Sequence, residues 1–161
     1  TGKRETELTK MDFFGSRTPL DRRAIHVRLL QPTSDFVIPP GKKDVVVTSL
    51  DWSPGQAISL TGCMGHLHMR GKSSRLMMRY PDGKVKILAS IPNYYYAWQV
   101  GSGLAFEKPI RVPADAKLFA ECVFDNSETN PNNPDPTKEI HYGQTIDRTE
   151  MCHMSIGYLI D

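Results

Sequence analysis

The residues best suited to chemistry are His66 and His68, which are separated by one residue within segment 62–71. In a strand, side chains two residues apart lie on the same face, with their Cα atoms about 6 to 7 Å apart. Two imidazoles placed in this way can share one metal ion. The spacing alone is a weak signal, and the other interpretation is a pair of surface or hydrogen-bonded strand histidines.

A second segment with candidate ligands, residues 149–158, lies near the C-terminus. In a strand, Met151, His153 and Ser155 share one face, while Cys152 lies on the other. A methionine in a β-core is usually filler, so Met151 is a ligand candidate only if its strand lies across from the two histidines. His153 has three interpretations: a fourth ligand, a residue that orients the ligands, or an ordinary exposed strand histidine.

Short β-runs must position these residues, because almost no stretch shows helical periodicity. Pro, Gly and Asp punctuate the runs, most clearly at Pro81-Asp82-Gly83, which predicts a hairpin. About eight strands at such spacing predict an all-β fold, an antiparallel, jelly-roll-like β-sandwich of two sheets. The predicted strands are Ile25 to Leu30, Asp44 to Leu50, Ala57 to Arg70, Ser74 to Tyr80, Lys84 to Ser90, Tyr95 to Val100, Lys117 to Asp125 and Met151 to Ile160.

With 161 residues, the chain suits one domain, which we place at residues 25–161 after an N-terminal arm, residues 1–24. Residues 1–30 hold seven basic and four acidic residues, so the basic excess lies in this region. We expect a solvated terminus, and the alternative is a contact with an acidic partner.

A long loop, Asn126 to Lys138, contains four Asn and three Pro. Proline removes backbone donors, so we expect neither a strand nor a helix there. A structural Ω-type loop is favoured over a Ca²⁺ site, because the carboxylates of Asp125, Glu128 and Asp135 lack ligand spacing.

Composition sets further limits. The net charge of +2 argues against nucleic-acid binding, no apolar run is long enough for a membrane span, and no leader precedes Thr1, so we expect a mature or trimmed segment. Three cysteines, Cys63, Cys122 and Cys152, allow at most one internal disulfide and leave one thiol.

Four motifs in order carry a resemblance to a known family. They are His66-Leu67-His68 followed by Arg70-Gly71-Lys72, the run 119–125, the turn 141–145, and Glu150-Met151-Cys152. Together they resemble the C-terminal domain of the copper type II, ascorbate-dependent monooxygenases, including bacterial relatives with an Asn/Pro-rich loop. The resemblance covers roughly residues 35–161.

The resemblance implies a copper site at which oxygen is activated for C–H hydroxylation, with His66, His68 and Met151 as ligands. Imidazoles suit copper in either oxidation state and a thioether favours Cu(I), whereas zinc rarely accepts methionine. The resemblance also pairs Cys122 with Cys152, which implies an oxidising compartment, the periplasm or the cell exterior. We expect Cys63 to be a buried small hydrophobe rather than a ligand or an intermolecular bridge.

The chain departs from the family in two respects. Met64 and Ser155 replace an Arg and a Tyr that hold peptide substrates in the family, so a glycine-extended peptide is not expected. Full family members have a second copper domain, yet only His26, His141 and His153 remain here; His26 is expected to be a plain strand residue, and His141 has the same ambiguity as His153.

Two functions follow from this comparison. The first is a mononuclear copper domain of the monooxygenase type that receives electrons from elsewhere. The second is a non-catalytic copper-binding or structural subunit of a larger extracytoplasmic assembly. Bacterial relatives often accompany c-type cytochromes, which fit either as electron donor or as neighbour.

Overall fold

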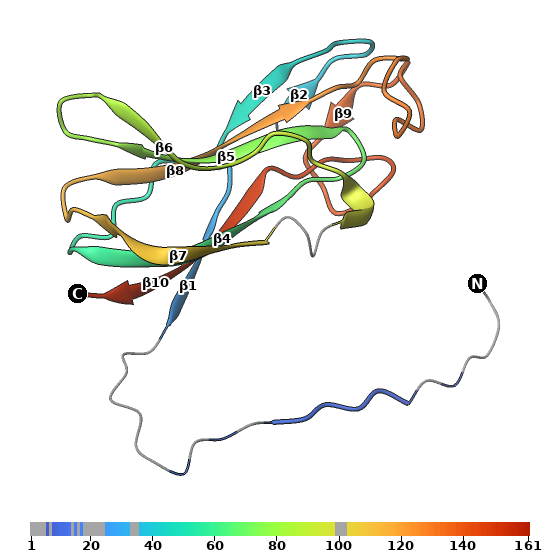
Figure 1. Ribbon diagram of the computed structural model, residues 1–161. Coiled ribbons are helices and arrows are strands. Elements are labelled where there is room, and N and C mark those ends of the chain that lie inside the picture. The colour runs from blue at the N-terminus through green and yellow to red at the C-terminus, as the bar shows by residue number, and fades with distance from the viewer. Residues whose placement is uncertain are drawn as a thin grey trace.

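The computed structural model describes residues 6, 8–13, 15, 17, 25–32, 36–98 and 103–161. Two four-stranded antiparallel sheets, with the orders β1-β10-β4-β7 and β3-β8-β5-β6, form the two layers of a β-sandwich, and β2 pairs with β9 beside them (Figure 1). The strands are β1 (His26–Leu30), β2 (Val37–Ile38), β3 (Val45–Thr48), β4 (Ile58–His66), β5 (Gly71–Arg79), β6 (Val85–Ile91), β7 (Gly103–Val112), β8 (Lys117–Phe124), β9 (Ile140–His141) and β10 (His153–Ile160).

The predicted fold class, an all-β antiparallel sandwich, is confirmed. The hairpin at Pro81-Asp82-Gly83 is also confirmed, because β5 and β6 pair antiparallel and the Tyr80 amide donates to the Lys84 carbonyl at 2.9 Å. Gly83 lies in the left-handed region, with φ of 84°, which glycine adopts at no steric cost. The proline-rich segment 126–138 contains neither strand nor helix, as predicted.

The strand predictions need correction at several places. Residues 96–98 of the predicted strand Tyr95 to Val100 form a short 3-10 turn, in which the Trp98 amide donates to the Tyr95 carbonyl at 2.9 Å; residues 99 and 100 lie outside the described residues. Aromatic residues favour strands only where a neighbouring strand packs against them. Conversely, β7 was not predicted, because Gly103 and Pro109 resemble breakers. Its position at a sheet edge tolerates proline.

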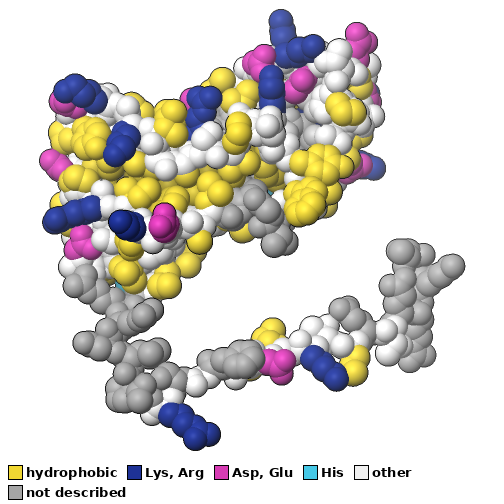
Figure 2. Space-filling model, in the orientation of Figure 1, with side chains coloured by type: hydrophobic (Ala, Val, Ile, Leu, Met, Phe, Trp, Pro, Cys, Tyr) yellow, Lys and Arg dark blue, Asp and Glu magenta, His cyan; other side chains and the backbone are white. Residues whose placement is uncertain are grey.

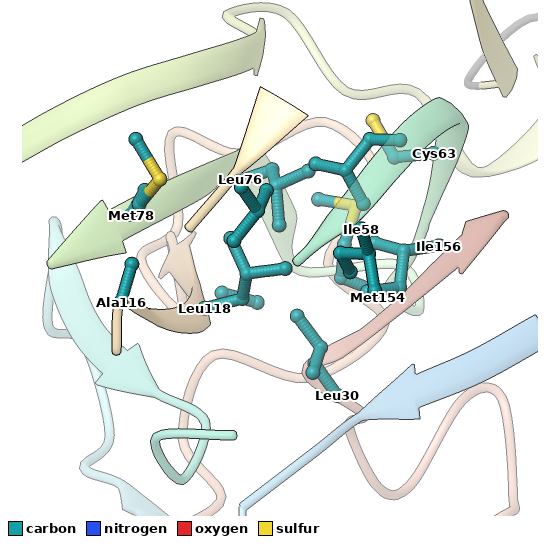
Figure 3. Close-up of a cluster of buried hydrophobic side chains, with 12 residues drawn as sticks. Leu30, Ile58, Cys63, Leu76, Met78, Ala116, Leu118, Met154 and Ile156 are labelled. Atoms are coloured by element: carbon teal, nitrogen blue, oxygen red, sulfur yellow. The ribbon is translucent and has the colours of Figure 1, made fainter. Parts of the chain in front are cut away.

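The main core fills the space between the two sheets. Ile58 on β4 and Ile156 on β10 face Leu76 on β5 and Leu118 on β8, and all four side chains are fully buried (Figure 3). Burial of apolar surface of this kind is the dominant stabilising contribution to a domain of this size. Cys63, the free thiol, belongs to the same cluster and lies on the core side of β4.

A register shift in β4 decides which face the histidines take. Leu60 and Cys63 both point into the core, although they are three positions apart, because the pairing with β10 shifts by one residue between Leu60 and Gly62. A side chain at Gly62 would meet the Leu104 carbonyl oxygen at 2.6 Å, so the shift requires glycine. Beyond the shift, Met64 and His66 lie on the outer face. Without the shift, His66 would point into the core.

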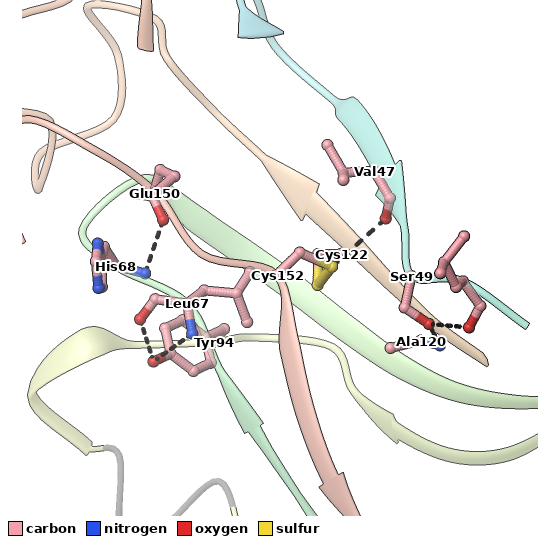
Figure 4. The surroundings of a disulfide bond; sticks show 10 residues. Val47, Ser49, Leu67, His68, Tyr94, Ala120, Cys122, Glu150 and Cys152 are labelled. Atoms are coloured by element: carbon pink, nitrogen blue, oxygen red, sulfur yellow. Dashed lines mark hydrogen bonds between the residues drawn. A yellow bond between two sulfur atoms is a disulfide. The ribbon is translucent and has the colours of Figure 1, made fainter. Parts of the chain in front are cut away.

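A second, smaller core surrounds a disulfide between Cys122 on β8 and Cys152 just before β10 (Figure 4). The bond confirms the predicted pairing and joins the two sheets covalently. Leu67, Tyr94 and Phe124 are buried in the same cluster. This core therefore supports the turn after β4, which contains His68, and the segment before β10, which contains Met151.

Surface charges of both signs are intermixed on the face shown in Figure 2, with hydrophobic side chains visible between them. Within the described residues, no helix has the length and hydrophobicity that a membrane crossing requires. Of the predicted arm, only residues 6, 8–13, 15 and 17 are described, and all of them are exposed.

We expect removal of the disulfide to destabilise the domain. The bond closes a loop of 30 residues, which the chain-entropy description values at about 3 to 4 kcal/mol. Urea unfolding of the double variant Cys122→Ala/Cys152→Ala should show this loss, with Cys63→Ala as the matched control that removes a buried sulfur without a cross-link. A loss no larger than that of the control would contradict the prediction, as would three titratable thiols in the unfolded, unreduced protein.

Candidate metal centre

The two candidate ligand segments meet at one end of the sandwich. His66 is the last residue of β4, and it pairs directly with His153, the first residue of β10. The ring centroids of His66 and His68 lie 5.3 Å apart, and those of His66 and His153 lie 6.2 Å apart. Three imidazoles are therefore neighbours.

Both strands are shorter than predicted. The sequence placed His68 inside the strand Ala57 to Arg70 and Met151 inside the strand Met151 to Ile160, but the ladder ends at His66 and His153. Residues 67–70 instead cross from β4 in one sheet to β5 in the other. His68 is therefore not held in place by strand pairing. Side chains that contact the backbone of this turn hold it instead.

A buried carboxylate makes the decisive contact. Glu150, whose side chain is fully buried (0 % exposed), accepts hydrogen bonds from the His68 amide at 2.7 Å and the Arg70 amide at 2.6 Å. Figure 4 shows the first of these bonds beside the disulfide. Glu150 directly precedes Met151, so one side chain ties the turn of the first motif to the backbone of the second.

The other side of the turn is held by Tyr94. Its hydroxyl donates to the Leu67 carbonyl at 2.6 Å and accepts from the Leu67 amide at 3.1 Å. Burial raises the pKa of Tyr94 to about 12, so the phenol stays protonated. A side chain at Gly71 would approach Leu67 Cβ to 2.6 Å and Tyr94 Cδ1 to 2.9 Å, so only glycine fits where the turn closes.

The guanidinium group of Arg70 also holds the turn in place. It is buried, and its Nε donates to Asn126 Oδ1 at 3.0 Å while Nη1 donates to the Asp147 carbonyl at 3.1 Å. Asn126 in turn donates to the Pro39 and Lys138 carbonyls at 3.0 and 2.9 Å. The Asn/Pro-rich loop is thus attached to the ligand turn through one arginine.

Met151 lies two residues before His153, just beyond the end of the ladder with β4. Cys152, between them, is buried in the core around the disulfide, as is Leu67 between His66 and His68. The alternation of half-buried and buried side chains from Met151 to His153 sets Met151 on the side away from this core. Met151, His66 and His153 are each half-buried.

Hydrogen bonding selects the tautomer of His68. Its Nδ1 lies 2.9 Å from the Thr149 carbonyl oxygen, which can only accept, so Nδ1 carries the proton and Nε2 carries the lone pair. His68 is 2 % exposed, and this burial lowers its pKa. The pKa of His153 is also lowered by burial and by the neighbouring imidazoles. A neutral imidazole with one oriented lone pair is the form that binds metals.

His153 has a partner of its own. The Tyr142 hydroxyl lies 3.2 Å from His153 Nε2, and the two ring centroids are 5.9 Å apart. Tyr142 forms an isolated parallel bridge with Glu150. His153, which had three interpretations from sequence, thus adjoins the histidine pair, while Tyr142, which stands inside the turn 141–145, had no predicted role.

The distances between the imidazole rings distinguish the candidate ligands. Two imidazoles that bind one metal ion at about 2.0 to 2.1 Å with a roughly tetrahedral angle between them have ring centroids about 5 Å apart, which is close to the 5.3 Å between His66 and His68, whereas the His66 and His153 rings are 6.2 Å apart. Among the described residues, no three His, Cys, Asp or Glu side chains lie close enough to hold a metal ion. A metal site in this geometry therefore needs a donor of another type, and Met151 is the residue that the sequence offers.

The remaining predicted residues lie elsewhere or face away. His26 on β1 stacks on Tyr158 with centroids 5.3 Å apart, as expected of a strand residue, and His141 on β9 contacts Glu139 at 3.0 Å. Cys63 points into the core and is buried, and burial raises the pKa of its thiol to about 11. Met64 and Ser155 are direct cross-strand partners.

Glu150, Thr149, Tyr94 and Tyr142 have no predicted role from sequence. Glu150 and Arg70 did stand inside the motifs that carry the resemblance. Charged residues within otherwise buried β-segments are a usable signal of a buried polar network. The carboxylates of the long loop serve local turns: Asp125 Oδ1 accepts from the Ser127 amide at 2.9 Å, and Asp135 Oδ1 accepts from the Thr137 amide at 3.0 Å. Such turns favour the structural interpretation of this loop over a Ca²⁺ site.

Comparisons with known proteins give no family. No protein-family model and no curated protein matches the chain. The nucleoplasmin-like N-terminal domain of Drosophila FKBP39 is similar over 89 % of this chain and 95 % of its own, with 8 % identity and a TM-score of 0.38. Structures of the Gx and Gt strains of infectious bursal disease virus are similar over 87 % of this chain, with 12 and 10 % identity and TM-scores of 0.35 and 0.33. This chain covers only 37 and 42 % of the length of those two chains. Similarity this low carries no functional argument.

Glu150 should make stability depend on pH in a recognisable way. Burial raises the pKa of Glu150 from 4.5 to about 7, although the hydrogen bonds from backbone amides act in the opposite direction. Between pH 4.5 and pH 7, the folded protein therefore binds more protons than the unfolded chain. This contribution to stability is complete below about pH 4.5 and is lost as the pH rises through 7, by up to about 3 kcal/mol.

The measurement is urea unfolding from pH 4 to 8 of the wild type and Glu150→Gln, which cannot ionise. The histidines with lowered pKa change stability in the opposite direction in both proteins, so the difference between the two curves isolates Glu150. We expect the wild type to lose stability relative to the variant as the pH rises. Parallel curves would refute the assignment.

Proposed function

We propose that this chain is a copper-binding domain of the ascorbate-dependent monooxygenase type, with His66, His68 and Met151 as ligands. Bound copper would supply O₂ activation and hydroxylation of a C–H bond, and the chain supplies the ligands and their geometry. One observation carries the proposal: the His66 and His68 rings lie 5.3 Å apart while Glu150 ties the segment of Met151 to the backbone of His68.

The donor set favours copper over other metals. Two imidazoles and a thioether form a soft site that suits Cu(I), whereas zinc prefers thiolates, imidazoles and carboxylates. The Thr149 carbonyl orients His68, as oxygen acceptors generally orient metal-binding histidines. The low exposure of His68 also restricts water around one ligand.

The second candidate function is a non-catalytic copper-binding or structural subunit of a larger extracytoplasmic assembly. The positions of the five histidines favour it. Three lie at the candidate centre, while His26 stacks on Tyr158 and His141 contacts Glu139, so this chain offers no second three-histidine site to store an electron. An electron would come from another domain, from a partner such as a c-type cytochrome, or from a small reductant.

We propose that the protein works in the periplasm or outside the cell. The disulfide between Cys122 and Cys152 supports this location, because such bonds persist in oxidising compartments. A substrate with a carboxylate anchor is not proposed. Met64 and Ser155, which replace the anchoring residues of the family, carry no positive charge.

Copper binding tests the proposal directly. We expect one Cu(I) per chain under reducing conditions, and His66→Ala, His68→Ala and Met151→Ala should each weaken binding by about 100-fold or more, because removal of a ligand exceeds the effect of an outer partner. His26→Ala, a strand histidine outside the centre, is the control. Unchanged copper content in the three ligand variants would refute the site.

Oxygen uptake separates the two candidate functions. The copper-loaded protein is supplied with ascorbate, and O₂ consumption is compared with that of Met151→Ala. Uptake by the wild type that is lost in the variant is expected for the monooxygenase type. Bound copper without uptake would leave the non-catalytic function.

A further inference from the structure

We propose that this chain forms a dimer in which β1 of one copy pairs antiparallel with β1 of a second copy, so that two four-stranded sheets join into one. Among the described residues, β1 ends the sheet β1-β10-β4-β7, so its free edge presents backbone amides and carbonyls that another strand can bind. The inference goes beyond the proposed copper site and does not depend on it, because it rests on a sheet edge.

Both polar side chains of β1 are engaged within the chain. The Arg28 guanidinium lies over the ring of Trp52, 5.7 Å from its centroid. His26 stacks on Tyr158 of the neighbouring strand β10, with ring centroids 5.3 Å apart. These contacts leave the other face of the segment to apolar side chains.

That face is exposed and symmetrical in sequence. Ile25, Val27 and Leu29 are exposed by 64, 74 and 40 %, and their spacing of two residues sets them on one face. In an antiparallel pair centred on Val27, this residue faces its own copy and Ile25 faces Leu29, so apolar side chains meet apolar ones. The segment is therefore complementary to itself, which favours a second copy over an unrelated partner.

The other edges of the two four-stranded sheets carry features that oppose such pairing. β7 contains Pro109, which has no amide to donate. β6 contains Lys86 and has a register shift in its pairing with β5, and β3 has only four residues and follows the charged run 42–44. Prolines, charges, irregular pairing and short length are the usual protection of a sheet edge. In contrast, β1 contains no proline and pairs with β10 without a register shift.

A hollow beside β1 enlarges the surface that a second copy can contact. It has a volume of about 500 Å³, and Val27, Leu29, Leu50 and Trp52 are among the residues that line it. Leu50 is 54 % exposed. Contacts beyond the paired strands are needed, because two strands on their own are only marginally stable in water.

Sedimentation velocity of the full chain, at concentrations from about 1 μM to 1 mM, tests the inference. We expect the mass to approach that of two chains and rise no further, because pairing of two β1 edges closes at two copies. Val27→Lys sets two like charges opposite each other, so it should weaken dimerisation by at least about 100-fold. Ile87→Lys, at a residue of the edge strand β6 that is 50 % exposed, is the matched control and should dimerise as the wild type does. Urea unfolding verifies that each variant folds.

A mixture of Val27→Lys and Val27→Glu tests the register, because opposite charges then face each other. We expect heterodimers from two variants that are each monomeric, and a mixture that remains monomeric would overturn the pairing centred on Val27. A wild type that stays monomeric, or that grows beyond two chains, would overturn the dimer. Dimers retained by Val27→Lys, or lost equally in Ile87→Lys, would overturn the assignment to β1.

Discussion

The buried carboxylate of Glu150 joins two segments that are 82 residues apart in the sequence. Moving a carboxylate out of water is costly unless hydrogen bonds compensate, and Glu150 recovers part of that cost from the amides of His68 and Arg70. Its bonds close the turn after β4 and hold the segment before β10 that contains Met151. Together with the hydrogen bonds from His68 Nδ1 to the Thr149 carbonyl and from Arg70 Nη1 to the Asp147 carbonyl, this contact continues the junction beyond His66 and His153, where the ladder ends.

Covalent and apolar contacts reinforce the same junction. The disulfide links the two sheets immediately behind Met151, and the small core around it buries Leu67, the residue between the two histidines. Rigid elements with a second layer of support hold functional side chains more accurately than free loops do. The register shift between Leu60 and Gly62 adds a separate requirement, because it turns His66 toward the outer face.

The sequence predicts the sandwich, the hairpin at Pro81-Asp82-Gly83 and the absence of strands from the long loop, because these depend on local alternation and turn chemistry. It failed at Tyr95 to Val100 and at β7, where position within the sheet overrides local preference. The site is predicted in part: the resemblance gave the Cys122–Cys152 pair, and spacing gave His66 and His68 as neighbours. Contacts such as Glu150 to His68, Tyr142 to His153 and Tyr94 to Leu67 are long-range, so sequence spacing cannot reveal them.

Copper bound jointly by His66, His68 and Met151 is the central claim. X-ray absorption at the copper edge of the Cu(I)-loaded, reduced protein tests it most directly, because sulfur and imidazole nitrogen scatter differently. We predict a spectrum with one sulfur and two imidazole donors, in which the sulfur contribution disappears in Met151→Ala and persists in Cys63→Ala. A wild-type spectrum with nitrogen and oxygen donors alone would contradict the account.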